Sequence, residues 1–361
     1  MTESLSDAER RDWLRLARTE NVGPVTFDQL VRRFGSATRA LEALPDLARR
    51  GGRAIRLADG AVVEKELADG AALGARLIAA CEPAFPQTLA ALDPPPPVIW
   101  ARGRLEMLAR PGVAVVGARV ASAAGQRFAR GLAADLGRAG HVVVSGMARG
   151  IDAAAHEGSL PTGAVAVLAG GVDDIYPPEH AALYARIVEA GCVVSENEPG
   201  RAAVARDFPR RNRIIAGLSR AVVVVEAEFR SGSLITARLA AEQGREVLAV
   251  PGSPLDPRAK GTNDLIRQGA AICEGADDVL RALEGLRNLR EPDREYGAHP
   301  GSDPDDALRE AVAALLSPTP VSRDELVRAT GAPAPLVFAA LTELALAGRC
   351  ELLPGGMVST S

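Results

Sequence analysis

Six short apolar runs recur at regular spacing through the middle of the chain, and they constrain its fold more than any other feature. They are "VAVVG" (113–117), "HVVVSG" (141–146), "AVAVLAGG" (164–171), "CVVSE" (192–196), "AVVVVEAE" (221–228) and "EVLAVPG" (246–252), with helical patterns between them. Continuous apolar strands that alternate with helices are typical of a parallel sheet covered on both faces. The sequence therefore predicts a large α/β domain, a doubly wound parallel sheet, over residues 79–285.

Two smaller regions flank this domain. Residues 1–78 carry amphipathic helical patterns around a Gly-Pro turn, which indicate either a SAM-like or helix-hairpin-helix-like domain or a plain helical cap. Residues 286–305 are charged and rich in Gly and Pro, so they predict a linker. Residues 306–361 show three helical patterns and then a hairpin with a Pro-Gly-Gly turn. That order of elements indicates a winged-helix-like domain.

Composition excludes several classes of protein. No run of about 18 apolar residues occurs, which argues against a membrane partner. The charged N-terminus does not have the pattern of a signal peptide, so we expect a cytoplasmic protein. The four cysteines are far apart with no CxxC, and no HExxH occurs, so we expect neither a disulfide framework nor a metal site.

The usual phosphate-binding motifs are also missing. The first loop reads Gly117-Ala118-Arg119 rather than GxGxxG, and the second strand ends in Ser145 rather than the acid that would hold a ribose hydroxyl. A Walker A sequence does not occur, and no two acids are paired as a catalytic dyad. We therefore expect no nucleotide cofactor and no catalytic residue.

Cations gather instead where the predicted strands end. The stretch "FPRRNRIIAGL" (208–218) concentrates three arginines at a helix start, although the net charge of the chain is −4. The complete set is Arg119, Arg149, Arg210, Arg211, Arg213, Arg230 and Lys260. Any one of them could be an internal salt-bridge partner. Because the carboxyl ends of parallel strands share one edge, however, the whole set predicts a binding site for a polyanion.

Four further residues near these strand ends allow two interpretations each. Asn212 could read a base edge or cap a helix. Asp152 and His156, one helical turn apart, could form an acid–base pair, but capping by Asp152 beside a packed histidine is favoured. Tyr176 could stack on a base or order its loop through its hydroxyl.

Long motifs in this region resemble those of the DprA/Smf family of bacterial DNA-processing proteins. They are "SGMARGIDAAAHEGSL", "VAVLAGGVDDIYP", "FPRRNRIIAGLSRAVVVVEAEFRSGSLITARLAAEQGREVLAVPGS" and "GTNDLIRQGA", in order between about 95 and 285. The resemblance implies an extended Rossmann-like fold that binds single-stranded DNA. It also implies loading of the RecA recombinase during natural transformation, with a homodimer as the working form.

The resemblance also implies which residues line the DNA pocket. Carried over by position, they are Arg119, Ser145, Gly146, Arg149, Gly150, Arg211, Asn212, Arg213, Ser231 and Gly232, and the neighbouring cations Arg210 and Lys260 complete the predicted site. The chain departs from the family pattern at Ala169, at His180 and in "SENEPG". The last two departures affect the pocket rim. Because aromatic residues make up only 3% of the chain, we expect phosphate contacts to dominate over base stacking.

Two other functions remain open at this point. The sheet also resembles that of nucleotide phosphoribohydrolases, and "VPGS" (250–253) resembles their glycine-rich loop, but Asp256 stands in a region where those enzymes need a glutamate. A scaffold that binds only proteins would leave the cations unexplained. In the C-terminal domain, the helical stretch 332–348 has Glu343 as its only charge, which suits burial against the other two helices or contact with a protein. We therefore expect this domain to be a protein-interaction or stabilising module rather than the DNA reader.

Overall fold

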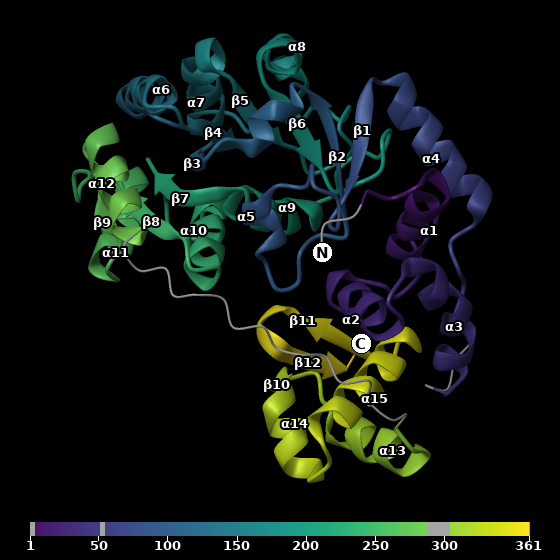
Figure 1. Cartoon of the computed structure of the whole chain (residues 1–361). Helices are drawn as coiled ribbons and strands as arrows, with labels where there is room; N and C mark the ends of the chain where they lie inside the picture. The colour runs from purple at the N-terminus through teal and green to yellow at the C-terminus, as the bar shows by residue number, and fades with distance from the viewer. Residues whose placement is uncertain (1–3, 51–54, 288–303, 361) are drawn as a thin grey trace.

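The computed structural model describes residues 4–50, 55–287 and 304–360, and a nine-stranded sheet forms its centre (Figure 1). The strands lie in the order β1-β2-β6-β5-β4-β3-β7-β8-β9. Neighbours from β6 to β9 pair in parallel, whereas β1 and β2 extend one edge as antiparallel strands. The strands are β1 (Ala75–Ala79), β2 (Val98–Gly103), β3 (Gly112–Val116), β4 (Val142–Ser145), β5 (Ala164–Val167), β6 (Cys192–Ser195), β7 (Ser219–Val224), β8 (Glu246–Ala249) and β9 (Ala271–Ile272).

The six predicted apolar runs become β3 to β8, and the predicted parallel pairing is confirmed. Strands β1 and β9 were not predicted. β1 (ARLIA) is interrupted by Arg76 and has no valine, and β9 has two exposed residues, so neither matches the pattern of the six predicted runs. Because β1 pairs with β2, the predicted domain boundary between residues 78 and 79 falls inside a strand of the central sheet.

Helices cover both faces of the sheet, as the apolar strands require. One face packs against α9 (Asp207–Gly217), α10 (Gly232–Glu242) and the short α5 (Gln87–Ala90). The other face packs against α6 (Ala123–Arg138), α7 (Ile151–Ser159), α8 (Ala181–Ala190) and α12 (Ala276–Arg287). Helix α11 (Lys260–Arg267) lies beside β8. Valines that alternate along each strand supply the apolar contacts to both layers.

Four helices form the N-terminal region and share a core with the edge of the sheet. They are α1 (Asp7–Ala17), α2 (Pro24–Phe34), α3 (Ala37–Arg50) and α4 (Gly60–Ala72). Trp13 packs edge-on against Phe27, with ring centroids 5.0 Å apart. Trp100 of β2 is buried in the same cluster and donates from Nε1 to Glu66 Oε1 of α4 over 2.9 Å. The helical domain is therefore built onto the antiparallel edge of the sheet.

The C-terminal region has winged-helix architecture, as predicted. Its elements are α13 (Asp306–Leu315), β10 (Val321–Ser322), α14 (Arg323–Thr330), α15 (Ala334–Leu346), β11 (Cys350–Leu353) and β12 (Met357–Thr360). The three strands form one small sheet in the order β10-β12-β11. Ser322 caps α14 by accepting from the N–H of Glu325 over 3.2 Å.

The winged-helix domain docks on the N-terminal helices through its third helix, α15 (Figure 1). Thr342 of α15 donates to the side chain of Gln29 of α2. The carboxylate of Glu343 is fully buried and lies 2.5 Å from Arg309 Nε within its own domain and 4.0 Å from Arg33 Nη1 of α2. The predicted protein contact of this helix is thus an intramolecular one here.

None of the helices in the described residues is, on its own, long and apolar enough to cross a bilayer. The bent pair Arg323–Thr330 and Ala334–Leu346 would meet that length and composition only when taken together.

Candidate nucleic-acid interface

The loops that follow β3, β4, β7 and β8 meet at the carboxyl edge of the sheet, because these four strands are parallel neighbours. The chain leaves β3 toward β4 on one side and later returns to pair β7 on the other, so the switch point of the topology lies at β3. In open α/β sheets, such a switch point is where ligands bind. Helix α9 also begins at this edge, since it leads back to the start of β7.

A stack of one cation and two aromatic rings stands at this edge. The guanidinium carbon of Arg119 lies 5.4 Å from the ring centroid of Phe208, at the start of α9. The ring of Tyr176 meets Phe208 edge-on, with centroids 5.5 Å apart and an interplanar angle of 65°. Tyr176 is 47% exposed. Arg119 therefore follows β3, Tyr176 follows β5, and Phe208 joins them, which gives a platform suited to a nucleobase beside a cation.

Phe208 was not among the predicted site residues, although it belongs to the quoted arginine stretch. An aromatic residue directly before a run of arginines was the available signal, but the sequence alone does not show whether that ring faces the core or solvent. The packing of Phe208 against Arg119 and Tyr176 resolves this. Tyr176 thus contributes a ring to the edge.

Three predicted cations are exposed and have no acidic partner among the residues that the structure describes. Arg210 lies on the first turn of α9, Arg230 lies in the loop before α10 with a left-handed φ of 67°, and Lys260 begins α11. Ser231 caps α10 by accepting from the N–H of Ser233 over 3.4 Å, and Gly232 is exposed at the first helical position. The edge therefore carries exposed cations without ion-pair partners in the described part of the chain, next to the start of α10.

Arg149 is exposed at the same edge but is already paired. Its Nε lies 2.5 Å from Oε1 of Glu179, and the two side chains are 57% and 51% exposed. This hydrogen bond raises the pKa of Arg149 and lowers the pKa of Glu179. A phosphate would have to compete with the Glu179 carboxylate for this guanidinium.

Several other residues predicted to line the DNA pocket make contacts inside the protein in this structure. Arg211 is only 9% exposed, and its Nη1 donates to the carbonyls of Gly146 (2.6 Å) and Val167 (2.5 Å). Asn212 donates from Nδ2 to the carbonyl of Gly232 over 3.2 Å. Burial lowers the pKa of Arg211 to about 10. These two side chains tie α9 to strand ends and to α10.

Arg213 and Ser145 are also committed to internal contacts. Arg213 is paired with Glu196, and its side chain is 18% exposed. Ser145 is fully buried and donates from Oγ to the carbonyl of Val115 over 2.7 Å. A polar residue at a strand end satisfies the neighbouring backbone as readily as a ligand, and the sequence does not distinguish these two uses.

The glycines of the loop after β4 permit close packing of backbone. Gly150 has a φ of +74°, and a Cβ there would stand 2.3 Å from the carbonyl oxygen of Ala118. A Cβ on Gly146 would stand 2.7 Å from the guanidinium of Arg211. Both glycines therefore let the loop after β4 lie directly against the loop after β3 and against Arg211.

Asp152 and His156 form no acid–base pair among the described contacts, and the predicted packed histidine is confirmed, but Asp152 does not cap α7, whose N-cap is Gly150 with no side-chain hydrogen bond. Asp152 Oδ2 accepts from the N–H groups of Gly146 (3.1 Å) and Ala148 (3.3 Å), the loop that enters α7. His156 is fully buried, and burial lowers its pKa to about 3, so its ring is neutral at physiological pH.

No described group of three or more His, Cys, Asp or Glu side chains could hold a metal ion.

Glu226, at the end of β7, occupies the start of α6. Its carboxylate accepts from the N–H of Ser122 (2.9 Å) and from Ser122 Oγ (2.5 Å), and Ser122 in turn caps α6. A cavity of about 400 Å³ opens beside it, bordered by Phe128 and Pro251. In dinucleotide-binding folds the corresponding helix start receives a phosphate. Here a carboxylate already fills that role.

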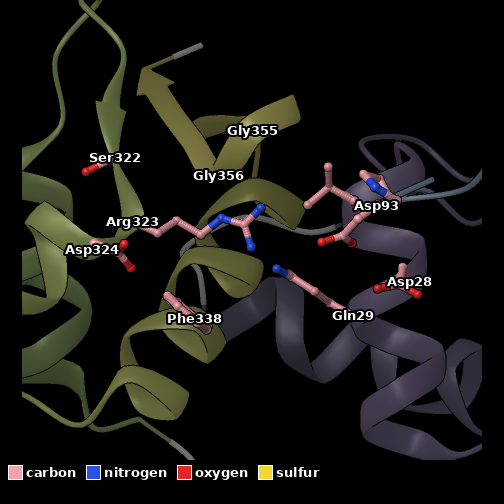
Figure 2. Close-up of a pocket in the computed structure, with 11 residues that line it drawn as sticks. Asp28, Gln29, Asp93, Ser322, Arg323, Asp324, Phe338, Gly355 and Gly356 are labelled. Carbon is pink, nitrogen blue, oxygen red and sulfur yellow. The ribbon is translucent and has the colours of Figure 1, made fainter. Parts of the chain in front are cut away.

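A second cavity, of about 290 Å³, lies between the N-terminal helices and the winged-helix domain (Figure 2). Its lining includes three acids, Asp28, Asp93 and Asp324, and Arg323 extends across it from the start of α14. Burial and the nearby Asp93 raise the pKa of Asp28. An acidic lining disfavours nucleic acid at this second cavity.

Three family models match the chain in order. The model described as DNA recombination-mediator protein A matches residues 76–284. A DprA-like N-terminal HHH domain matches residues 7–69, and a DprA winged helix domain matches residues 297–356.

Individual relatives agree with these models. The chain is 40% identical to Protein Smf of Escherichia coli (strain K12) over 290 residues, which cover 78% of this chain and 76% of that protein. It is 42% identical to the DNA processing protein DprA of Streptococcus pneumoniae over 206 residues, which cover 55% of this chain and 71% of that protein.

Two solved structures share the fold. The X-ray structure of DprA from Streptococcus pneumoniae matches with a TM-score of 0.64 and 32% identity, covering 77% of this chain and 98% of that one. The structure of DNA processing protein A from Helicobacter pylori, which describes a single-stranded DNA binding mode, matches with a TM-score of 0.54 and 28% identity. It covers 60% of this chain and 97% of that one.

Proposed function

The chain belongs to the family of DNA recombination-mediator protein A, and from that premise we propose that it binds single-stranded DNA at the carboxyl edge of its central sheet. We further propose that it delivers this DNA to a RecA-type recombinase during transformation, that it works as a homodimer, and that it does so in the cytoplasm without a catalytic step of its own.

The observation that carries the DNA-binding proposal is the stack of Arg119, Phe208 and Tyr176 beside exposed cations. A single strand offers unpaired bases and a phosphate at every step. Aromatic rings bind any base face with about 1–3 kcal/mol per base, and cations bind the backbone without regard to sequence. The edge offers both groups within the loops of neighbouring strands. Duplex DNA hides its base faces and would use only the cations.

The placement of Glu226 argues against the alternative, a nucleotide phosphoribohydrolase. Its two oxygens are committed to Ser122 at the start of α6, where they would repel the phosphate of a nucleotide. Asp256, which stands where such enzymes need a glutamate, is held by Arg258 over 2.9 Å. These contacts favour a binding protein over an enzyme.

The test is a fluorescence anisotropy titration of a labelled oligothymidylate against the full chain, beside a duplex of the same length. We expect the single strand to bind at least about tenfold more tightly, because only it presents base faces to the aromatic stack. Equal affinity for the single strand and the duplex would show that Phe208 and Tyr176 do not contribute to DNA binding. Release of a free base from nucleoside monophosphates, lost on Glu226→Gln, would favour the hydrolase instead.

The recombinase and the homodimer need separate tests. Light scattering after size-exclusion chromatography gives the oligomeric state directly. For delivery, we expect the chain to speed RecA filament formation on single strands that are coated with single-strand binding protein. DNA binding with no effect on filament formation would keep the binding proposal and reject the delivery step.

A further inference from the structure

We propose that Arg211 and Asp152 are positioning residues of the DNA site. In this view Asp152 holds the N–H of Gly146 and Arg211 holds its carbonyl, and together they fix the loop that carries Arg149 without touching DNA themselves. This inference rests on the proposed function, and it assigns to Arg211 a role different from the phosphate contact that the sequence resemblance implied.

The two side chains meet at one residue of the loop. Asp152 Oδ2 accepts the N–H of Gly146 over 3.1 Å, and Arg211 Nη1 donates to the carbonyl of Gly146 over 2.6 Å. Asp152 also accepts from the N–H of Ala148. Both side chains are at least nine-tenths buried, at 6% and 9% exposed. Two buried opposite charges that each bond the same residue favour one placement of the loop.

The loop needs these two side-chain contacts because its backbone conformation is unusual. Met147 adopts a left-handed φ of 60° with its side chain fully buried, and Gly150 has a φ of +74°. Conformations of this kind persist only where the surroundings over-determine them. Directly after this loop, the N–H of Ile151 donates to the carbonyl of Ala118 over 3.2 Å, which seats the loop against the segment that presents Arg119.

Two of the three guanidinium nitrogens of Arg211 are already committed to oxygens of the protein. Its Nη1 serves two carbonyls, and its Nε donates to Asn212 Oδ1 over 3.2 Å. Turning outward would leave the carbonyls of Gly146 and Val167 without this donor, a cost comparable to lost charged hydrogen bonds. The neighbouring Arg210 is exposed, so it could contact a phosphate without losing such internal hydrogen bonds.

Substituting Asp152 separates the two explanations, because they predict opposite changes in the affinity for DNA. If the site were governed by charge alone, Asp152→Asn would remove an anion near a polyanion and would strengthen binding of oligothymidylate. Under the positioning role the same change weakens binding, because the neutral amide oxygen makes weaker hydrogen bonds to the N–H groups of Gly146 and Ala148 than the carboxylate does. We expect a loss of about fivefold or more for Asp152→Asn.

Substituting Arg211 gives a second test. Lysine keeps the charge but loses the Nε–H that binds Asn212 and the planar fork that holds Nη1 between the two carbonyls, so we expect Arg211→Lys to bind as weakly as Arg211→Gln. We expect the double variant with Asp152→Asn to bind no more weakly than the weaker single variant.

Arg110 is the matched control, because it donates to the carbonyls of Thr162 (2.6 Å) and His141 (3.2 Å) at the opposite edge of the sheet. Arg110→Gln should stay within about twofold of the wild type.

Wild-type affinity in Arg211→Lys, or tighter binding by Asp152→Asn, would overturn the proposal. Hydrogen exchange of the segment around Gly146 in DNA-free protein supplies a readout independent of DNA. It should become faster in both variants and stay unchanged in Arg110→Gln. If the wild-type chain does not bind single strands, the proposed function fails, while this exchange measurement still decides whether the contacts of Asp152 and Arg211 order the loop.

Discussion

Glu179 holds the guanidinium of Arg149, with Oε1 2.5 Å from Nε, at the edge where we place the DNA backbone. A carboxylate in this position imitates a phosphate oxygen and competes with it. Replacing Glu179 by Gln should therefore release Arg149 and raise the affinity for single strands about two- to fivefold, as expected for an exposed pair. Anisotropy titration measures the change.

Glu157 provides the control for this variant. It lies 2.5 Å from Arg130 in a pair of similar exposure on the surface of α6 and α7, away from the strand ends. Glu157→Gln removes one negative charge as well, so an equal gain in both variants would assign the effect to net charge. Weaker binding by Glu179→Gln would show that this pair supports the site.

Phe208 should supply much of the base contact. Phe208→Leu keeps apolar volume but removes the ring on which Tyr176 and Arg119 pack. We expect a loss of about 1–2 kcal/mol in binding, or roughly five- to thirtyfold, with no change in salt dependence. Phe34→Leu is the control, since Arg33 packs over that ring at 5.4 Å in the N-terminal region. If both variants bind like the wild type, the stack is only structural.

Salt dependence reports the number of phosphates that the edge neutralises. With about four to six contacts, log K should fall against log salt with a slope of roughly −3 to −4. Changing Arg210, Arg230 and Lys260 together to Gln should make that slope shallower by about 2. The exposed Arg39, Arg186 and Arg220, changed together, alter the net charge equally and should leave the slope unchanged. A wild-type slope near zero would reject the cationic binding site.

The sequence predicted the sheet and its edge well, because Val-rich parallel strands and Gly-rich strand ends have strong local patterns. It could not separate Arg211 from Arg210. The two are adjacent and chemically identical, yet one is 9% exposed and the other lies in solvent. Which way a side chain turns at a helix start depends on the carbonyls that surround it, here those of Gly146 and Val167. Those partners are distant in sequence.

The flanking domains show a similar limit. The lone Glu343 leads to the prediction that α15 does not read DNA, but its partners could not be foreseen from the sequence. They are Arg309, from another helix of the same domain, and Arg33, from the opposite end of the chain. Local patterns reveal a helix and its apolar face, whereas the partners of a buried charge depend on how helices distant in sequence pack together.

His156 should make the protein sensitive to acid. Burial holds its pKa at about 3, below the usual 6.5, so the folded state keeps the ring neutral where the unfolded chain takes up a proton. Stability from this residue is full above pH 6.5 and is lost as the pH falls toward 3. At pH 5 the loss should be about 2 kcal/mol. Denaturant unfolding at pH 7 and pH 5 should show that His156→Leu loses less stability between the two values than the wild type does. Equal losses would mean that the buried ring is protonated or hydrated in the native protein.

The last prediction concerns the winged-helix domain. Winged helices usually contact DNA through basic side chains on the third helix, but α15 has neither lysine nor arginine. Its side chains Thr342 and Glu343 reach the N-terminal helices instead, and the cavity between the two domains is acidic. Ending the chain after about residue 300 should therefore leave the affinity for single strands within a few-fold, a loss under about 1 kcal/mol.

Truncation also uncovers the surface on which α15 docks, so a full-length companion is needed. Thr342→Arg places a bulky charge in that interface and should separate the domains without removing either one. Both proteins should bind oligothymidylate like the wild type, because the proposed site lies wholly on the loops of the central sheet. A hundredfold loss in both, with the circular dichroism of a folded protein, would show that the winged-helix domain takes part in gripping DNA.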